Sequence, residues 1–261
     1  MSEPCYFLKF GLIVTGKAEQ QHLPKLFRSL VKSQICAFEV IGFVDQRSPI
    51  TSERKKLKMV GVGGIIPNKD KMLIGFPARR YLENDCTLVI VIDDLEFAQT
   101  SQVQQKFNRY RNAVDSVLRD AQKPRASVHF LVNMLEAYFF AHAEALNLVF
   151  ELDPAQEDFE GDVGTIRNPK AKLKEIEPNY REVDDSGKVL ELLDLEYILS
   201  KPNACASLRT LFAWCTLALA KYQDKAYYQS LPMYDKFQLS QGIMSDVTKP
   251  QLGLLQSNMS N

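Results

Sequence analysis

The sequence predicts an α/β fold in which a mostly parallel sheet is covered by helices on both sides. The run from Leu88 to Ile92 is continuously apolar and rich in β-branched residues, which is typical of a strand buried on both faces. Shorter apolar runs lie before and after it, and segments with helical periodicity separate them. Strands that alternate with helices in this way pair in parallel, because each helix returns the chain to the start of the next strand.

The first α/β unit begins with a strand expected at Phe10 to Val14, followed by the turn Thr15-Gly16-Lys17. From Leu23 to Leu30, apolar residues recur three and four positions apart, which gives a helix one apolar face. A second strand is expected at Ala37 to Phe43. Strand, glycine turn and helix in this order open an α/β unit.

Further elements follow on both sides of the central run. Pro77 suits the first turn of a short helix. The segment from Gln102 to Asp120 predicts a polar helix, and Ser127 to Leu131 predicts a fourth strand. That strand runs into a helix expected from Asn133 to Asn147.

After residue 147 the pattern becomes helical without clear strands. Helices are expected at Pro169 to Ile176, Lys188 to Leu199 and Ser207 to Lys221. We therefore expect an α/β core over residues 1–147, a helical region packed on it over residues 148–252, and a flexible tail over residues 253–261.

Composition narrows the class of protein. The 261 residues are 46% hydrophobic and 25% charged, so the chain can bury a full core. Basic and acidic residues both number 32, so no global field attracts nucleic acid or membrane, and any polyanion must bind a local patch. The most apolar helix candidate, Leu208 to Ala220, is too short to span a bilayer.

The cysteines predict a cellular compartment. The five residues are scattered, odd in number and without a C-x-x-C motif, which argues against a zinc site and against a disulfide framework. No signal-peptide pattern is present at the N-terminus. A reducing cytoplasm is the expected location.

Three acids end the central run: Asp93, Asp94 and Glu96. Carboxylates at the end of such a strand lie where open α/β sheets bind ligands. Because three acids this close repel one another, a hard divalent cation such as Mg²⁺ or Mn²⁺ is the simplest explanation. The alternative is a polar strand end that meets water. Asp93 and Asp94 point to opposite faces of a strand, so one of them is expected to face the site.

Three segments together resemble a Toprim-type domain. They are Leu12 to Glu19, the strand end Asp94-Leu95-Glu96, and the later Leu135-Glu136-Ala137-Tyr138. The resemblance covers residues 8 to 147 and is closest to the bacterial family known as domain of unknown function 4276. It implies the compact α/β fold shared with topoisomerases, primases and related nucleases, with Mg²⁺ held on acidic residues.

The resemblance also assigns roles to residues, with one departure. The first loop of the family reads Glu-Gly and then Thr or Ser and Glu, whereas Thr15 stands here in place of the first Glu. The family's Asp-x-Asp motif becomes Asp94-Leu95-Glu96, and Glu136 matches a further acid on a helix. The resemblance thus implies metal ligands at Asp94, Glu96 and Glu136, with Glu19 as the remaining catalytic acid.

The chemistry that needs such a set is phosphoryl transfer from nucleic acid. One or two Mg²⁺ or Mn²⁺ ions would neutralise phosphate charge and lower the pKa of a bound water. Backbone N–H groups at Gly16 and Lys17 could hold a phosphate at the start of the helix. The basic segment Arg54 to Lys58 is a further candidate for phosphate contacts, although charge runs are more often solvated faces.

Simpler interpretations remain for the two helical acids. Glu19 in a first helical turn is favoured by the helix dipole alone. Glu136 can point to solvent from a mixed helix face.

Three functions follow from these patterns. The first is a metal-dependent nuclease or phosphodiesterase that acts in bacterial defence. The second is a catalytically degenerate module, marked by Thr15, that binds or regulates a partner such as an ATPase subunit. The third is a nucleotide-binding protein of Rossmann-like architecture, which is weaker because no G-x-G-x-x-G follows the first strand. The sequence leaves the oligomeric state open.

Overall fold

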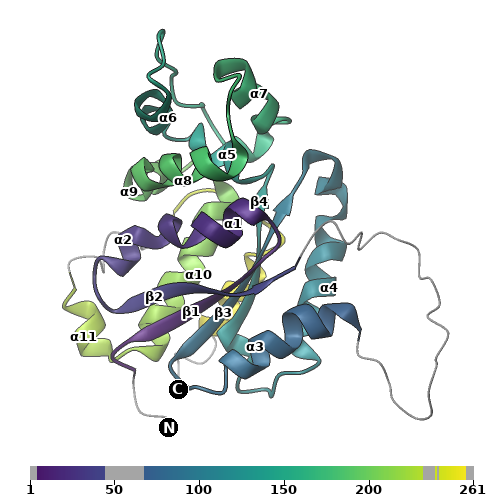
Figure 1. The fold of residues 1–261 in the computed structure, drawn as a ribbon. Helices are drawn as coiled ribbons and strands as arrows, with labels where there is room; N and C mark the ends of the chain where they lie inside the picture. The colour runs from purple at the N-terminus through teal and green to yellow at the C-terminus, as the bar shows by residue number, and fades with distance from the viewer. Residues whose placement is uncertain (1–4, 45–67, 232–238, 240, 257–261) are drawn as a thin grey trace, which may run out of the picture.

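A four-stranded, all-parallel sheet forms the centre of the protein, flanked by helices as expected (Figure 1). The computed structural model describes residues 5–44, 68–231, 239 and 241–256. The strand order is β2-β1-β3-β4. The bounds of the strands are β1 Leu8–Val14, β2 Cys36–Phe43, β3 Thr87–Leu95 and β4 Ala126–Val132. The predicted α/β class with a parallel-sheet core is confirmed.

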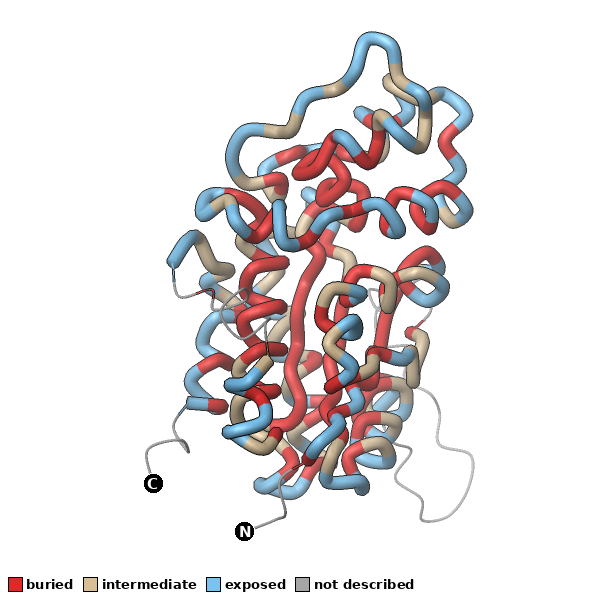
Figure 2. Tube along the Cα trace, turned by 90° about the vertical axis from the view of Figure 1, so that its left-hand side faces the viewer, coloured by how far each residue is buried: buried red, intermediate tan, exposed pale blue. Residues whose placement is uncertain are grey.

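Alternate residues of the strands build two separate apolar layers. In β3, Ile90 and Ile92 pack on the face that carries α1 (Lys17–His22), α2 (Arg28–Val31) and α10 (Ala206–Tyr222). Val89 and Val91 pack on the other face, against α3 (Phe76–Tyr81) and α4 (Val103–Asp115). Figure 2 shows the strands as buried stretches with exposed residues on the outer helices. Both faces of β3 are therefore buried, as its continuous apolar run predicts.

The helical C-terminal region supplies part of the first layer. The Trp214 ring of α10 packs edge-on against Phe10 of β1, at 6.3 Å between ring centroids. Phe212 stacks on Phe27 at 5.4 Å. One core is thus built from both sides of residue 147, and that residue lies inside α6 (Ala143–Phe150). The domain boundaries stay a prediction.

Two predicted helices are each broken into two. The segment expected from Asn133 to Asn147 forms α5 (Leu135–Phe139) and α6. The Asp158 carboxylate accepts a hydrogen bond from the Ala143 N–H at 2.7 Å, which starts a new helix there. The segment expected from Lys188 to Leu199 forms α8 (Glu182–Leu192) and α9 (Leu195–Ser200), where Asp194 caps the second helix through the Tyr197 N–H.

The helix predicted from Gln102 to Asp120 ends early, at Asp115. The Arg111 guanidinium donates hydrogen bonds to the carbonyls of Lys123 and Ala126, which holds the start of β4 against the last turn of α4. Pro77 lies in the first turn of α3 as expected.

The remaining elements complete the two helical layers and the group of helices over the end of the sheet. They are α7 Pro169–Ile176, α11 Lys225–Gln229, α12 Pro250–Gln256, and the short turns η1 Leu23–Phe27, η2 Lys71–Gly75, η3 Phe97–Gln102, η4 Lys123–Arg125 and η5 Val163–Thr165. Helices α5 to α9 gather over the end of the sheet at which β1 and β4 finish (Figure 1). The strand ends that carry the acids are therefore covered by this helical cap.

Helix α12 and the segment before it lie against the outer strand β4. The side-chain amide of Gln251 accepts a hydrogen bond from the Val128 N–H at 2.8 Å and donates one to the Val128 carbonyl at 2.7 Å. Leu255, which falls within the predicted flexible tail, is fully buried. Residues 253–256 are thus helical, and residues 257–261 lie outside the described residues.

The cysteine pattern argued against a disulfide framework, but the structure contains a disulfide between Cys5 and Cys86. The two residues are 81 positions apart in the sequence, but parallel pairing places Lys9 opposite Thr87 and so brings the segments before β1 and β3 together. Their Cα atoms lie 5.6 Å apart. The cysteine pattern therefore no longer argues for a reducing compartment, and the cytoplasmic location stays a prediction. No helix in the described part of the chain is long and apolar enough to cross a membrane.

Candidate active site

The strand order creates a point at which the chain reverses direction across the sheet. Strand β2 lies on one side of β1, and β3 lies on the other. The chain leaving β1 enters α1 on one face, whereas the chain leaving β3 enters α4 on the opposite face. Open α/β sheets bind ligands in the crevice that such a divergence opens at the carboxyl ends of the strands.

Glu19 and Asp94 meet at this point. Asp94 lies at the end of β3 on the α1 face, and Glu19 lies in the first turn of α1. Their side chains share a hydrogen bond, which requires a proton on one of the two carboxyl groups. Burial is the main cause that raises the pKa of both groups, and the charge of Glu19 raises the pKa of Asp94 further. The raised pKa values favour the form in which the pair holds one proton.

Glycine at position 16 allows Glu19 to lie there. A Cβ at Gly16 would collide with the Glu19 carboxylate, which folds back over the start of α1. The Glu19 carboxylate thus lies next to Gly16, where a phosphate was expected to bind. The Lys17 side chain is exposed. The phosphate-binding role of Gly16 and Lys17 stays a prediction.

Glu136 is the third acid of the site and is buried, in the first turn of α5. The turn before it is strained, since Asn133 and Met134 both have positive φ angles, of 59° and 70°. Lys170 lies 3.7 Å from the Glu136 carboxylate, and the Tyr180 hydroxyl donates to it at 3.2 Å. The charge of Glu136 also raises the pKa of Asp94, which places the two acids in one electrostatic cluster.

Asp93 points to the other face of β3, as strand alternation predicts. Its carboxylate accepts hydrogen bonds from Thr15 at 2.6 Å, Tyr110 at 2.9 Å and Lys106 at 3.3 Å. Thr15, which departs from the Glu implied by the resemblance, is therefore a hydrogen-bond donor that holds the ends of β1 and β3 together. Asp93 serves this structural contact and does not face Glu19.

Glu96 does not join the buried acids. Strand β3 ends at Leu95, and the backbone turns into η3, so Glu96 is exposed and lines a separate pocket with Asn133 and Arg167. The charges that act most on Asp94 come from Glu19, Glu136 and Asp93. The structure thus places Glu96 outside the cluster in which the resemblance implied a metal ligand.

The donors of the site suit a hard cation in kind. The Asp94 Oδ1 atom is buried and lacks a hydrogen-bond partner, and a divalent cation could replace the proton between Asp94 and Glu19. In number the donors fall short: across residues 5–44, 68–231, 239 and 241–256, no three His, Cys, Asp or Glu side chains converge closely enough to hold a metal ion. The positive charge of Lys170 balances Glu136 instead.

The sequence interpretation missed the residues that the helical cap brings to the site. Lys170 also pairs with Glu182 at 2.8 Å, and the Tyr180 hydroxyl bonds to the Ser186 hydroxyl at 2.6 Å. Glu136 and Glu182 raise the pKa of Lys170 despite the burial that lowers it, so its ammonium group stays charged. No motif links these residues to the strand ends, because they reach Glu136 only through the packing of α7 and α8.

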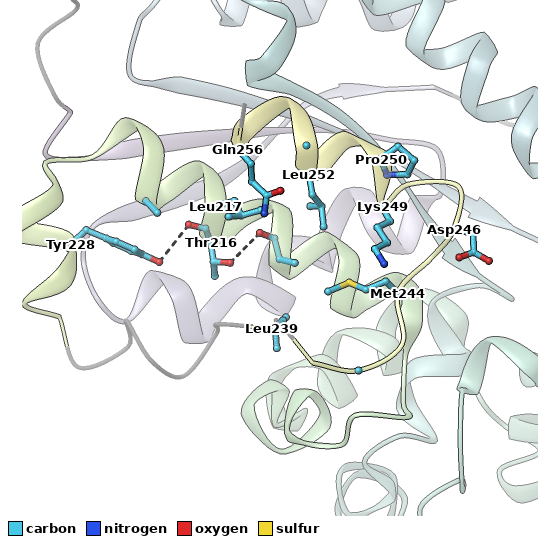
Figure 3. Close-up of a pocket in the computed structure, with 14 residues that line it drawn as sticks. Thr216, Leu217, Tyr228, Leu239, Met244, Asp246, Lys249, Pro250, Leu252 and Gln256 are labelled. Atoms are coloured by element: carbon cyan, nitrogen blue, oxygen red, sulfur yellow. Dashed lines mark hydrogen bonds between the residues drawn. The ribbon is translucent and has the colours of Figure 1, made fainter. Parts of the chain in front are cut away.

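A larger pocket of about 810 Å³ lies elsewhere, between α10 and α12 (Figure 3). Its lining is mostly apolar and includes Leu217, Met244 and Leu252, and Tyr228 donates a hydrogen bond to the Thr216 carbonyl at its rim. Asp246 is the only acid that lines it in the described part of the chain. This pocket contains no paired acids, so the candidate active site is the cluster at the strand ends.

Comparison of the chain with protein-family models, with curated proteins and with solved structures gave no match. The Toprim resemblance and its bacterial family therefore stay predictions, and the parallel α/β fold and the buried acids stand on the structure alone.

Proposed function

We propose that this protein is a metal-dependent phosphodiesterase that acts on nucleic acid. The observation that supports this most is an electrostatic cluster of three acids from three elements at the diverging strand ends: Glu19 and Glu136, which are buried, and the half-buried Asp94. Buried acids in such a cleft are costly, because each must lose its hydration, and functional sites are where this cost is commonly tolerated.

The residues of the site divide the work between them. Glu19 and Asp94 would hold Mg²⁺ or Mn²⁺ in place of their shared proton, and Glu136, which is paired with Lys170, would add negative charge beside them. The ion supplies neutralisation of phosphate charge and a lowered pKa for a bound water. Lys170 and Tyr180 orient Glu136, and the Lys170 ammonium lies at the edge of the cluster, where a substrate phosphate could contact it.

The first experiment is a calorimetric titration of Mn²⁺ into the wild-type protein and the Asp94→Asn variant. We expect binding by the wild type and a loss of at least about tenfold in affinity for the variant, since a direct ligand is removed. Asp120→Asn, which neutralises an exposed acid on the far side of the sheet from Glu19, is the matched control and should bind as the wild type does.

Cleavage is tested next, with labelled single-stranded and duplex DNA and RNA in Mn²⁺. Cleavage by the wild type and the Asp120→Asn control, but not by Asp94→Asn, is the expected result. The absence of Mn²⁺ binding at millimolar concentration, or equal binding by Asp94→Asn, would overturn the proposal.

A second function, a degenerate module that binds or regulates a partner, is favoured by two observations. Thr15 replaces an acid of the implied motif and is engaged by Asp93, and Lys170 already balances Glu136. In that case Glu19 and Asp94 retain their proton at all metal concentrations. The same titration separates the two functions, and a partner such as an ATPase subunit would then be sought by co-purification.

A further inference from the structure

A pocket of about 250 Å³ adjoins the acids but is not built from them. It lies where β3 and β4 end and α7 begins, and its lining includes Glu96, Phe97, Asn133, Arg167 and Lys170. Lys170 connects it to the candidate active site, because the same ammonium group contacts Glu136. A ligand in this pocket would thus reach the edge of the acidic cluster.

One wall of the pocket is a stacking surface. Phe97 is 43% exposed, although a phenyl ring is ordinarily buried, and the Arg167 guanidinium lies over its ring at 5.2 Å from the centroid. Arg167 is exposed as well. An exposed aromatic ring beside a planar guanidinium is the surface on which single-stranded nucleic acids stack their bases, and it accepts any base because every base has a π face.

A second wall offers one hydrogen-bond acceptor, the side-chain oxygen of Asn133. Asn133 is 1% exposed, its Nδ2 donates to the Gly164 carbonyl at 2.7 Å, and its Oδ1 has no partner. Because the amide nitrogen is committed to Gly164, the unpaired atom is an acceptor that needs an N–H donor. The exocyclic amino groups of adenine, cytosine and guanine and the N3–H groups of thymine and uracil are such donors on the open edge of an unpaired base.

The third wall is positive. The side chain of Asn168, at the N-cap of α7, makes no capping hydrogen bond, so N–H groups at the start of this eight-residue helix are free of a side-chain acceptor. The ammonium group of Lys170 lies in the same first turn. A phosphate placed here would meet the positive end of the helix and would share the Lys170 ammonium with Glu136 and Glu182.

From these three walls we infer that the pocket binds one unpaired nucleotide of a single-stranded nucleic acid. Its base stacks on Phe97 and Arg167, an N–H group on the base edge donates to Asn133, and its phosphate lies toward Lys170. This inference deepens the proposed function by naming the substrate as single-stranded. It rests on the proposed function only where cleavage is concerned, because binding of the nucleotide requires no metal ion.

The test is fluorescence anisotropy with labelled twelve-residue oligonucleotides in EDTA. We expect the wild type to bind single-stranded oligomers at least about tenfold more tightly than a duplex of the same length, whose bases are stacked and paired. Phe97→Ala and Arg167→Gln should each weaken binding by about 5- to 100-fold, the range found for the loss of one stacked base.

Two matched variants control for general effects. Phe76 is 41% exposed and Arg79 is exposed, both on α3, so Phe76→Ala and Arg79→Gln remove the same chemistry elsewhere and should leave binding unchanged. Circular dichroism and thermal melting would verify that each variant is folded.

The outcomes separate this inference from the proposed function. Binding in EDTA that depends on Phe97 and Arg167, without Mn²⁺ binding, would sustain the nucleotide pocket and overturn the phosphodiesterase. Mn²⁺ binding with equal affinity for single strands and duplex, or with no effect of either pocket variant, would overturn the pocket alone. Displacement of the oligonucleotide by inorganic phosphate at millimolar concentration would indicate a simple anion site and also overturn it.

Discussion

At the scale of single residues, the contact between Glu19 and Asp94 has a cost to the fold. Burial raises the pKa of both carboxyl groups, and their deprotonation at higher pH brings two negative charges together. The raised pKa values mean that the folded protein binds more protons than the unfolded chain. The stabilisation from this pair is therefore present at acidic pH and is lost as the pH rises through the folded pKa values.

Removal of one charge should accordingly stabilise the protein. We expect Glu19→Gln to raise the free energy of unfolding by ~1 kcal/mol at pH 8. The gain should be smaller at pH 4.5, where the folded pair holds its proton and the unfolded Glu19 is partly protonated. Urea unfolding at the two pH values measures it, with the exposed Glu191→Gln as the control. An equal gain at both pH values would contradict the assignment of the shared proton.

Thr15 gives the opposite expectation to the one implied by family resemblance. Restoration of a Glu would place a second carboxylate against Asp93, which is 1% exposed and accepts a hydrogen bond from the Thr15 hydroxyl. We expect Thr15→Glu to lower the free energy of unfolding by ~2–4 kcal/mol without any gain of cleavage. Thermal melting and the oligonucleotide cleavage assay check both parts, and a stable, active variant would show that Thr15 had replaced a catalytic acid.

At the scale of elements, the site depends on turns that follow strand ends. All four strands were predictable to within three residues, because each contains a short apolar run, which is continuous in the fully buried β3. The breaks between α5 and α6 and between α8 and α9 were not predicted. The first of them depends on the Asp158 side chain, which starts α6 from a later loop. Similarly, Glu19, Asp94 and Glu136 were identifiable from their positions, whereas Lys170 reaches the site only through tertiary packing.

Strand β4 also carries a buried histidine that should make stability depend on pH. Burial lowers the pKa of His129 to about 3, and neither ring nitrogen has a hydrogen-bond partner beside Trp214. Below about pH 6.5 the unfolded chain therefore binds a proton on this histidine that the folded protein does not bind. The free energy of unfolding consequently decreases as the pH decreases.

We expect His129 to cost the wild type ~2 kcal/mol between pH 7 and pH 5. The difference in unfolding free energy between these pH values should be smaller by this amount in His129→Leu, measured by urea denaturation. The comparison uses pH dependence and not absolute stability, so repacking around Leu does not affect it. An identical pH dependence in both proteins would show that His129 is not buried in its neutral form.

At the scale of the whole molecule, the C-terminal helices hold the sheet together. Helix α10 covers one face, and Gln251 of α12 pairs with both polar groups of Val128 on the outer strand. We expect Gln251→Ala to lower the free energy of unfolding by ~1–3 kcal/mol, because it leaves a buried N–H and a buried carbonyl unpaired. Gln256→Ala on the same helix, at an exposed position, is the control in chemical denaturation. An unchanged midpoint would contradict this role for the amide.

The pairing of Gln251 with Val128 has a consequence for assembly. A side-chain amide has the same donor and acceptor as a peptide group, so Gln251 acts as a single residue of a missing fifth strand and occupies the place at which another chain would join. Beyond its effect on stability, removal of this amide should turn β4 into a template for strand addition. The protein would then begin to associate edge to edge as its concentration rises.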